Sequence, residues 1–225
     1  MKKNNPLVVC ATNSVAQDIT ANVLLAIGAK PAMVSQLEDA VEITGMAKAV
    51  LINIGTVDDR QLETMLAMVD VCKERQIPYV LDPVACHLSK YRFGCVKKII
   101  NVLPPTIIRG NHAEIDFLEK EIADLEEHSV ILSTGKVDRI HNGITDEERV
   151  EGGEEMLQDV TATGCAQGAI CAAMLGFGHE SAVAVGYASI MMKAAGEMAW
   201  KKAKQPGSFR TALIDALYKQ RKLIV

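Results

Sequence analysis

Short apolar runs alternate along the chain with longer stretches in which apolar residues recur every three or four positions. Short apolar runs bounded by turn residues are typical of strands, whereas the longer spacing is typical of helices with one buried face. The predicted strands are residues 7–10, 32–34, 49–54, 79–81, 106–108 and 130–132, with two further strands at 137–141 and 156–160. The predicted helices are residues 14–27, a helix from Ser35, residues 56–76, 91–102 and 111–127, and a helical region from Gly164 onward whose last helix begins at Ser208.

This regular alternation predicts an α/β fold with a mainly parallel central sheet, whose last two strands are antiparallel additions. The strand at 49–54 is apolar apart from Asn53, as expected for a strand covered on both faces. Gly28 is expected to end the first helix, and the sequence at 35–38 to open the second with a capping box. No repeat or linker interrupts the pattern, so we expect a single domain spanning residues 1–225.

Composition excludes several classes of function. Apolar residues make up 49% of the chain and charged residues 23%, which is typical of a globular protein. The net charge of −4 argues against a nucleic-acid-binding surface. The apolar region after Cys165 contains His179, Glu180 and Lys193, so we expect buried helices there and no membrane partner. None of the six cysteines forms a C-x-x-C pair, which favours reduced thiols and a cytoplasmic location over a zinc site.

The segment 159–168, DVTATGCAQG, predicts a turn from a strand into a long Ala-rich helix. The first backbone N–H groups of a helix lack intrahelical partners, so small residues there allow an anion to approach closely. Gly164 and Cys165 lie at this end, and the helix dipole is expected to lower the pKa of the Cys165 thiol. A tight turn with a buried structural cysteine is the alternative interpretation. Neither a P-loop nor a dinucleotide-binding glycine motif is present, and the glycines at 152 and 153 predict a plain turn.

Polar groups follow several of the predicted strands. Asp82 comes after the strand at 79–81, Arg109 after 106–108, and Thr134 and Gly135 after 130–132. Ligands bind at the carboxyl ends of parallel strands, and an acid and an arginine beside an anion site suit a magnesium nucleotide. The alternatives are structural: Asp82 as a turn residue before Pro83, and Asn111 with Glu114 as a helix-capping box.

Taken together, the order of the motifs resembles that of one family, the hydroxyethylthiazole kinases of the ribokinase-like superfamily. The resemblance covers nearly the whole chain, and its specificity comes from the number and order of its parts. These are Thr12-Asn13, TANVLLAIGAKPAM at 20–33, LINIGT at 51–56, LDPV at 81–84, IRGNxxEI at 108–115, TGxVD at 134–138, VTxxGC at 160–165 and PGSF at 206–209.

The resemblance implies a ribokinase-like three-layer sandwich that transfers the γ-phosphate of ATP to the primary hydroxyl of 4-methyl-5-(2-hydroxyethyl)thiazole in thiamine salvage. It implies a homotrimer with active sites at subunit interfaces, and ATP and Mg²⁺ as cofactors. By the same resemblance each site residue receives a role. Cys165 and Gly164 are catalytic; Arg109, Thr134, Asn111 and Gly135 contact ATP; Met33, Asn13 and Ala162 lie at the thiazole; and Asp82 and Glu114 act through magnesium and its waters.

The chain departs from the family pattern at three places. Ala162 replaces an expected glycine near the substrate, where a Cβ narrows the pocket or removes a positive φ. Asp82-Pro83-Val84 continues as Ala85-Cys86-His87 rather than through small residues, and the helical region after Glu114 is short. Two alternatives therefore remain: a catalytically weakened ligand-binding homologue, or a kinase of another small alcohol such as hydroxymethylpyrimidine. Cys rather than Asp at position 165 favours the thiazole kinase over the latter.

Overall fold

The computed structural model describes residues 5–142 and 147–223, which form one eight-stranded sheet in the order β2-β1-β3-β4-β5-β6-β7-β8. The first six strands of this order are parallel, as predicted, and β7 and β8 are antiparallel; β7 matches the antiparallel strand predicted at 137–141. The strands are β1 (Leu7–Ala11), β2 (Lys30–Met33), β3 (Ala49–Asn53), β4 (Tyr79–Asp82), β5 (Ile107–Asn111), β6 (Val130–Thr134), β7 (Asp138–His141) and β8 (Glu148–Val150).

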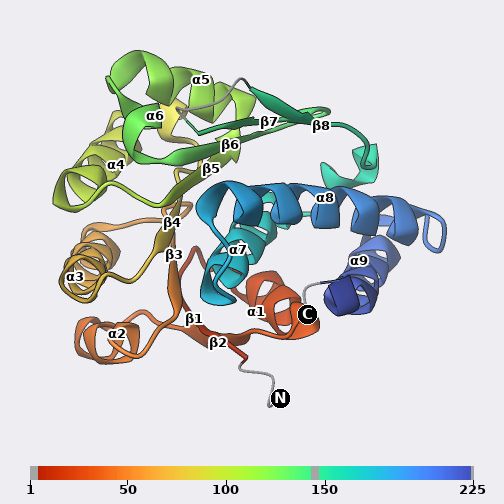
Figure 1. The fold of residues 1–225 in the computed structure, drawn as a ribbon, viewed down its shortest axis with the longest axis horizontal. Helices are drawn as coiled ribbons and strands as arrows, with labels where there is room; N and C mark the ends of the chain where they lie inside the picture. Colours follow the sequence, from red (N-terminus) through yellow and green to blue (C-terminus); the bar gives the residue numbers. More distant parts are fainter. Residues whose placement is uncertain (1–4, 143–146, 224–225) are drawn as a thin grey trace.

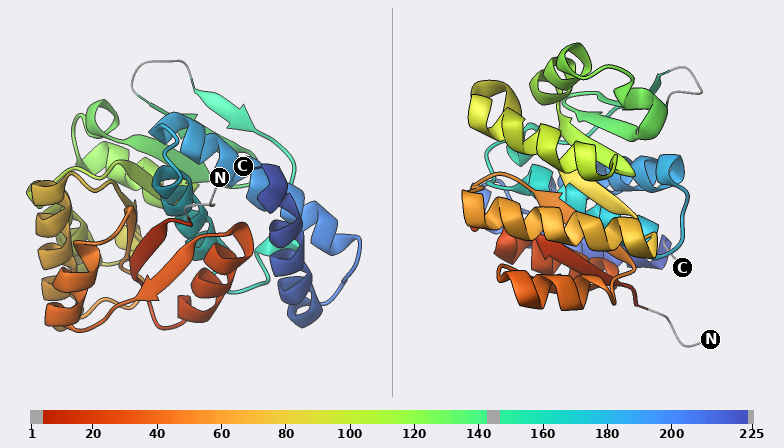
Figure 2. Two further views of the ribbon diagram at one scale, coloured as in Figure 1. Left: turned by 60° about the horizontal axis from the view of Figure 1, so that its bottom comes forward. Right: turned by 90° about the vertical axis from the view of Figure 1, so that its left-hand side faces the viewer.

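Helices cover both faces of the sheet, which gives three layers (Figures 1 and 2). One face carries α1 (Gln17–Ile27), α7 (Thr163–Gly176), α8 (Ser181–Trp200) and α9 (Pro206–Gln220). The other carries α2 (Leu37–Thr44), α3 (Asp59–Arg75), α4 (Lys90–Val102), α5 (His112–Glu121) and α6 (Leu125–His128). No helix among the described residues is long and apolar enough to cross a membrane.

The period-two geometry of the strands divides the core into two apolar clusters, one on each face. In β1, Val8 and Cys10 belong to the cluster shared with α1, α7, α8 and α9, whereas Val9 and Ala11 belong to the opposite cluster. The same alternation runs through β3, where residues 49–52 are all fully buried. Strands buried on both faces need apolar residues at successive positions, which explains why the sequence shows continuous runs there.

Several helix ends follow the local signals in the sequence. Gly28, at φ +94°, ends α1 in a left-handed conformation that favours glycine. Asp58 and Gln61 form a capping box at the start of α3, so this helix begins at Asp59 rather than at residue 56. Asn111 and Glu114 form the capping box that the sequence suggested for α5.

Other local predictions were wrong. The capping box at 35–38 does not form, because α2 begins at Leu37 and its N-cap residue Gln36 makes no side-chain cap bond. The helix predicted at 111–127 is divided into α5 and α6, because Asp124 adopts a left-handed conformation at φ +57°. Residues 156–160 do not form a strand: Glu155–Leu157 is a 3₁₀ helix held by turn hydrogen bonds, and the edge strand is β8 instead.

Candidate active site

Three neighbouring parallel strands end in polar side chains on the same face of the sheet. Asn53 ends β3, Asp82 ends β4, and Arg109 is the middle residue of β5. Each is two residues beyond a core residue of the α7 face (Leu51, Val80 and Ile107), so alternation aims all three at α7. All three are buried. The carboxyl ends of β3, β4 and β5 therefore present an amide, a carboxylate and a guanidinium to one helix.

A hydrogen-bonded chain connects the acid to the loop after β1. Asn13 Nδ2 donates to Asn53 Oδ1 at 2.8 Å, and Asn53 Nδ2 donates to Asp82 Oδ2 at 2.7 Å. Asn13 Nδ2 also lies 3.6 Å from Cys165 Sγ. Asn53 Oδ1 additionally accepts from the backbone N–H of Gly55 at 3.0 Å. These contacts bring Asn13, Asp82 and Cys165, which are distant in sequence, into one cluster.

Asp82 is fully buried, and this burial raises the pKa of its carboxyl to about 6. The charge of Arg109 counteracts the rise in pKa, whereas the carboxylate of Glu114 adds to it. Asp82 Oδ2 lies 4.0 Å from Arg109 Nη1. Asp82 Oδ1 has no hydrogen-bond partner among the described residues. An orphaned buried carboxylate oxygen at the site edge indicates a place where a ligand or cation completes the coordination.

Helix α7 begins beside this cluster with its amides pointing at the strand ends. Ala162 is the N-cap residue, and its carbonyl accepts the first helical hydrogen bond, from Ala166 N at 3.0 Å. The N–H groups of Thr163, Gly164 and Cys165 therefore precede the first closed helical turn. Ala162 adopts φ +66°, so the substitution of alanine at this position has not removed the left-handed conformation.

Arg109 lies directly against the start of α7. A Cβ at Gly164 would come within 2.6 Å of Arg109 Nη1, so only glycine allows this approach. Arg109 Nη2 donates to Thr134 Oγ1 at 2.7 Å and to Gln167 Oε1 at 3.4 Å, while Nε is buried without a partner among the described residues. A guanidinium next to the positive end of a helix dipole is repulsive in isolation. An anion bound beside both groups would offset this repulsion, so this is the predicted anion site.

The expected activation of Cys165 by the helix dipole is wrong. Burial, followed by the Asp82 carboxylate, raises the pKa of the Cys165 thiol to about 11. Hydrogen bonds from Asn53 and Asn13 and the charge of Arg109 lower the pKa by less. Desolvation of a thiolate is a larger effect than one helix terminus. The thiol therefore stays protonated at neutral pH.

Glu114 uses both carboxylate oxygens to hold backbone groups. Oε2 accepts from the Asn111 N–H at 2.8 Å, which closes the capping box, and Oε1 accepts from the Ala85 N–H at 2.7 Å. Ala85 has φ +56°, so Glu114 ties a strained turn after Asp82 to the start of α5. The interpretation of Glu114 as a helix-capping residue is thus confirmed. Any further ligand of Glu114 would have to use the remaining lone pairs of these two oxygens.

The donor set fits magnesium in one respect. Asp82 supplies a buried oxygen that lacks a partner among the described residues, and the negative charge of Glu114 raises the pKa of Asp82, so a cation bound at Asp82 would offset the charge of both carboxylates. The described residues contain no group of three or more His, Cys, Asp or Glu side chains arranged to hold a metal ion by themselves. Magnesium would therefore keep water or phosphate ligands in this site.

The structure places the remaining predicted residues along the same edge of the sheet. Met33 ends β2 opposite Cys10 and is half-buried, two strands away from Asn53. Gly135 directly follows β6, and a Cβ there would lie 2.4 Å from His112 Nε2. Asn111 is exposed and caps α5, so its side chain is committed to the Glu114 N–H at 2.9 Å.

Four polar residues of this region were not identified as site residues from sequence: Asn53, Gln167, Asp138 and Lys193. Each is buried and hydrogen-bonded within the network. The sequence did contain a signal for Asn53, because this residue is the one polar position in an otherwise apolar strand. Gln167 and Lys193 lie in apolar helices, where a single polar residue does not reveal what faces it.

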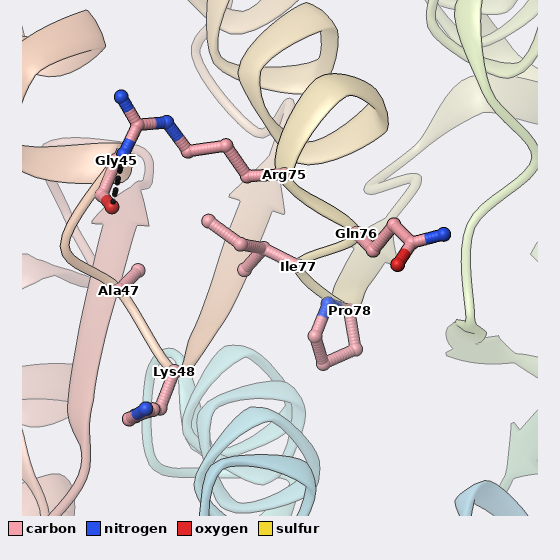
Figure 3. Close-up of a pocket in the computed structure, with 7 residues that line it drawn as sticks. All are labelled: Gly45, Ala47, Lys48, Arg75, Gln76, Ile77 and Pro78. Atoms are coloured by element: carbon pink, nitrogen blue, oxygen red, sulfur yellow. Dashed lines mark hydrogen bonds between the residues drawn. The ribbon is translucent and has the colours of Figure 1, made fainter.

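A shallow hollow of about 530 Å³ lies away from this cluster, at the amino ends of β3 and β4 (Figure 3). Lys48 and Arg75 are its cationic lining, and Arg75 Nη1 donates to the Gly45 carbonyl at 3.2 Å. It contains none of the predicted site residues, so it is not the candidate active site.

The three-layer arrangement defines a protein of the ribokinase-like fold. A pyridoxal kinase from Staphylococcus aureus in complex with AMP-PCP and pyridoxal has the same fold, with a TM-score of 0.65 and 16% identity over 91% of each chain. The model of the hydroxyethylthiazole kinase family matches residues 1–125 and 119–222. This chain belongs to that family.

Individual relatives agree with this assignment. Hydroxyethylthiazole kinase of Serratia proteamaculans is 37% identical over 241 aligned residues, which cover 98% of this chain and 90% of the relative. The corresponding kinase of Escherichia coli strain SMS-3-5 is 35% identical, with 96% and 90% covered. The structure of a hydroxyethylthiazole kinase protein from Pyrococcus horikoshii superposes with a TM-score of 0.88 at 34% identity, covering 96% of this chain and 88% of that one.

Proposed function

We propose that this protein transfers the γ-phosphate of ATP to the primary hydroxyl of 4-methyl-5-(2-hydroxyethyl)thiazole, a step of thiamine salvage. The observation that supports it most directly is the packing of the Arg109 guanidinium against Gly164 at the start of α7, beside buried Asp82. The guanidinium and the positive end of the helix dipole both favour phosphate oxygens bound beside them. The family membership supplies the acceptor class.

On this proposal, Arg109, Thr134, Gly135 and Asn111 form the ATP side of the site. Arg109 and Thr134 are already hydrogen-bonded to each other, so the guanidinium is oriented before ATP binds. The backbone N–H groups of Gly164 and Cys165 face the transferred phosphoryl group and stabilise its developing charge. Phosphoryl transfer depends mainly on such positioning and neutralisation, with little covalent work by the protein.

Cys165 orients the acceptor hydroxyl on this proposal and does not abstract its proton. Its thiol is held beside Asn13, and burial and the Asp82 carboxylate raise its pKa to about 11. A neutral thiol both donates and accepts a weak hydrogen bond, which suffices to aim the hydroxyl. Asn13, Met33 and Ala162 complete the acceptor side, with the Ala162 methyl narrowing the pocket where the family has glycine.

Asp82 and Glu114 hold magnesium through waters on this proposal, and the bound ion neutralises charge on the phosphate oxygens. Asp82 offers the unpartnered Oδ1 for this purpose. Glu114 keeps its backbone contacts and contributes through its charge and its remaining lone pairs.

We also propose a homotrimer in the cytoplasm. Val15 and Leu25, at the start and on the outer face of α1, are 60% and 56% exposed, and such apolar side chains favour burial against another subunit. All six cysteines are free thiols, which fits a reducing compartment. A single stable species of one chain's mass in light scattering would contradict the trimer.

The test is a coupled ADP-release assay with the thiazole alcohol and with hydroxymethylpyrimidine, followed by mass spectrometry of the product. We expect a phosphate ester of the thiazole alcohol, loss of activity in excess EDTA and recovery with Mg²⁺. Preference for the pyrimidine would support the alternative kinase. Binding of the thiazole without ADP release would support the weakened homologue.

A further inference from the structure

Lys193 of α8 is a buried lysine whose ammonium group is surrounded by oxygen atoms. Its side chain is only 8% exposed. Four oxygen atoms of the described residues lie within 3.3 Å of Nζ: the carbonyls of Gly135 (3.3 Å), Lys136 (3.0 Å) and Gly152 (3.1 Å), and Asp138 Oδ1 (3.3 Å). Lysine is seldom buried without a specific partner, and here the ammonium has four oxygen partners.

The oxygens come from segments far apart in the sequence. Gly135 and Lys136 belong to the turn between β6 and β7, the two strands that α8 also contacts. Gly152 follows β8 in a left-handed conformation at φ +93°. The next glycine, Gly153, donates its N–H to Glu197 Oε1 at 2.9 Å, one helical turn beyond Lys193. One side chain thus fastens two loops to the same helix.

A continuous set of contacts leads from Lys193 to the predicted phosphate site. Asp138 Oδ1 also accepts from the Gly135 N–H at 3.1 Å, and Oδ2 accepts from Ser189 Oγ at 2.6 Å. Gln167 Nε2 donates to Asp138 Oδ2 at 3.2 Å, and Gln167 Oε1 accepts from Arg109 Nη2 at 3.4 Å. The orientation of Gln167, and with it one contact of Arg109, therefore depends on Asp138.

We propose that Lys193 is a positioning residue for the nucleotide. Its ammonium binds the carbonyls of the 135–136 turn and neutralises the charge of Asp138. Asp138 in turn holds the orientation of Gln167 and, through it, of Arg109. The inference rests on the proposed function, because it takes the Thr134–Gly135 turn and Arg109 as the ATP side. Lys193 itself is too buried to touch ATP. Its effect is on ATP affinity and leaves the acceptor side, formed by Asn13, Met33, Ala162 and Cys165, unaltered.

The experiment compares Lys193→Met with Val185→Ala, a core variant two turns earlier in α8 whose apolar side chain makes no hydrogen bond. Val185 is fully buried in the cluster of that face, so both variants weaken the packing of α8. For Lys193→Met we expect the KM for ATP and the Kd for ADP in calorimetry to rise about tenfold or more. The KM for the thiazole alcohol should stay within about twofold, since its contacts are unchanged. Val185→Ala should lower the melting temperature without changing the ADP Kd.

Chemical rescue separates charge from packing. Lys193→Ala leaves a space lined by three carbonyls and a carboxylate, so added ethylammonium should restore ADP affinity, whereas tetramethylammonium at the same ionic strength should not. If Lys193→Met does not fold, Lys193→Gln, which retains two donors but no charge, takes its place in the comparison. Unchanged ADP affinity in the folded variant, or equal losses in Val185→Ala, would overturn the inference. A wild type that binds ADP in a Lys193-dependent way but does not phosphorylate the thiazole would instead overturn the proposed function alone.

Discussion

Gly164 and Arg109 touch so closely that a single added carbon would separate them: a Cβ at position 164 would lie 2.6 Å from Nη1 and 2.7 Å from Nη2 of Arg109. The contact places a cation at the positive end of α7. Because both groups attract anions, the proposed function leads us to expect that the geometry of this pair determines where a phosphate of ATP binds.

Gly164→Ala should therefore weaken ATP binding far more than it weakens the fold. The guanidinium has to move away from the helix, and loss of a charge-assisted hydrogen bond of about 1.5–3 kcal/mol corresponds to roughly a 10–100-fold higher KM for ATP. Steady-state kinetics with varied ATP measures this. Gly168→Ala, one turn later, is the matched control, because a Cβ there meets only ordinary contacts, with Leu51 Cδ1 at 3.4 Å and Asp82 Oδ2 at 3.8 Å. The control should keep the wild-type KM and gain up to about 1 kcal/mol of helix stability. Equal KM values for both variants would contradict the anion site.

Asp82→Asn should abolish most activity while stabilising the metal-free protein. Burial raises the pKa of Asp82 from 3.8 to about 6, so the ionised form costs folding free energy above the folded pKa. The cost is relieved as pH falls from about 6 towards 3.8, because the folded state binds its proton first. The difference corresponds to up to roughly 3 kcal/mol at pH 8. Urea unfolding in EDTA at pH 8 and pH 4.5 measures it: the advantage of the variant should shrink at the lower pH. A variant that loses activity and stability together would indicate a turn residue.

Cys165 should react slowly with alkylating reagents at neutral pH. Burial and the Asp82 carboxylate raise the pKa of its thiol to about 11, so the thiolate fraction is small below pH 9 and grows tenfold per pH unit. The rate of iodoacetamide labelling at Cys165, followed by mass spectrometry, should rise across pH 7–10 without a plateau. A plateau near pH 8 would show an activated thiolate.

Replacement of Cys165 tests its role in orientation. Cys165→Ser keeps a donor and acceptor at nearly the same place and should retain most of the turnover, whereas Cys165→Ala should lower kcat by roughly tenfold, the value of one neutral hydrogen bond. ADP affinity should not change in either variant, because the Cys165 backbone N–H is retained. A loss of several thousandfold in Cys165→Ser would instead assign the thiol a role as base.

Ala162→Gly should stabilise the fold. Ala162 lies at φ +66°, where an L-residue other than glycine is strained by roughly 1–2 kcal/mol, offset by the larger entropy of glycine in the unfolded chain. We expect a net gain of about 0.5–1 kcal/mol in the free energy of unfolding, measured by urea denaturation. Ala169→Gly, inside α7, is the opposite control and should lose about 1 kcal/mol. Ala162→Gly should also lower the discrimination against bulkier acceptor alcohols, since it removes the methyl group from the predicted pocket.

The strand-and-helix order could be predicted from local pattern because buried strands and amphipathic helices leave periodic signals. The predictions failed where a tertiary contact or a backbone conformation decided the outcome. The helix at 111–127 is broken by Asp124 in a left-handed conformation. The predicted strand at 156–160 is replaced by the 3₁₀ helix Glu155–Leu157 and the turn after it, although the composition of these residues suits a strand. The prediction of a lowered pKa for the Cys165 thiol failed for a related reason. The position of Cys165 at the start of a helix is visible in the sequence, but its burial beside Asp82 is not.

The sequence by itself determined which chemical groups end the parallel strands, since Asp82, Arg109 and Thr134 follow or end apolar runs that have to lie in one sheet. It also determined the small residues at the start of α7. Only the tertiary structure decided how these groups act on one another: that Asn53 connects Asn13 to Asp82, that Glu114 is occupied by two backbone N–H groups, and that Lys193 closes the network behind Arg109. The reason is physical: hydrogen bonds and desolvation depend on distances between segments remote along the chain, which no local periodicity records.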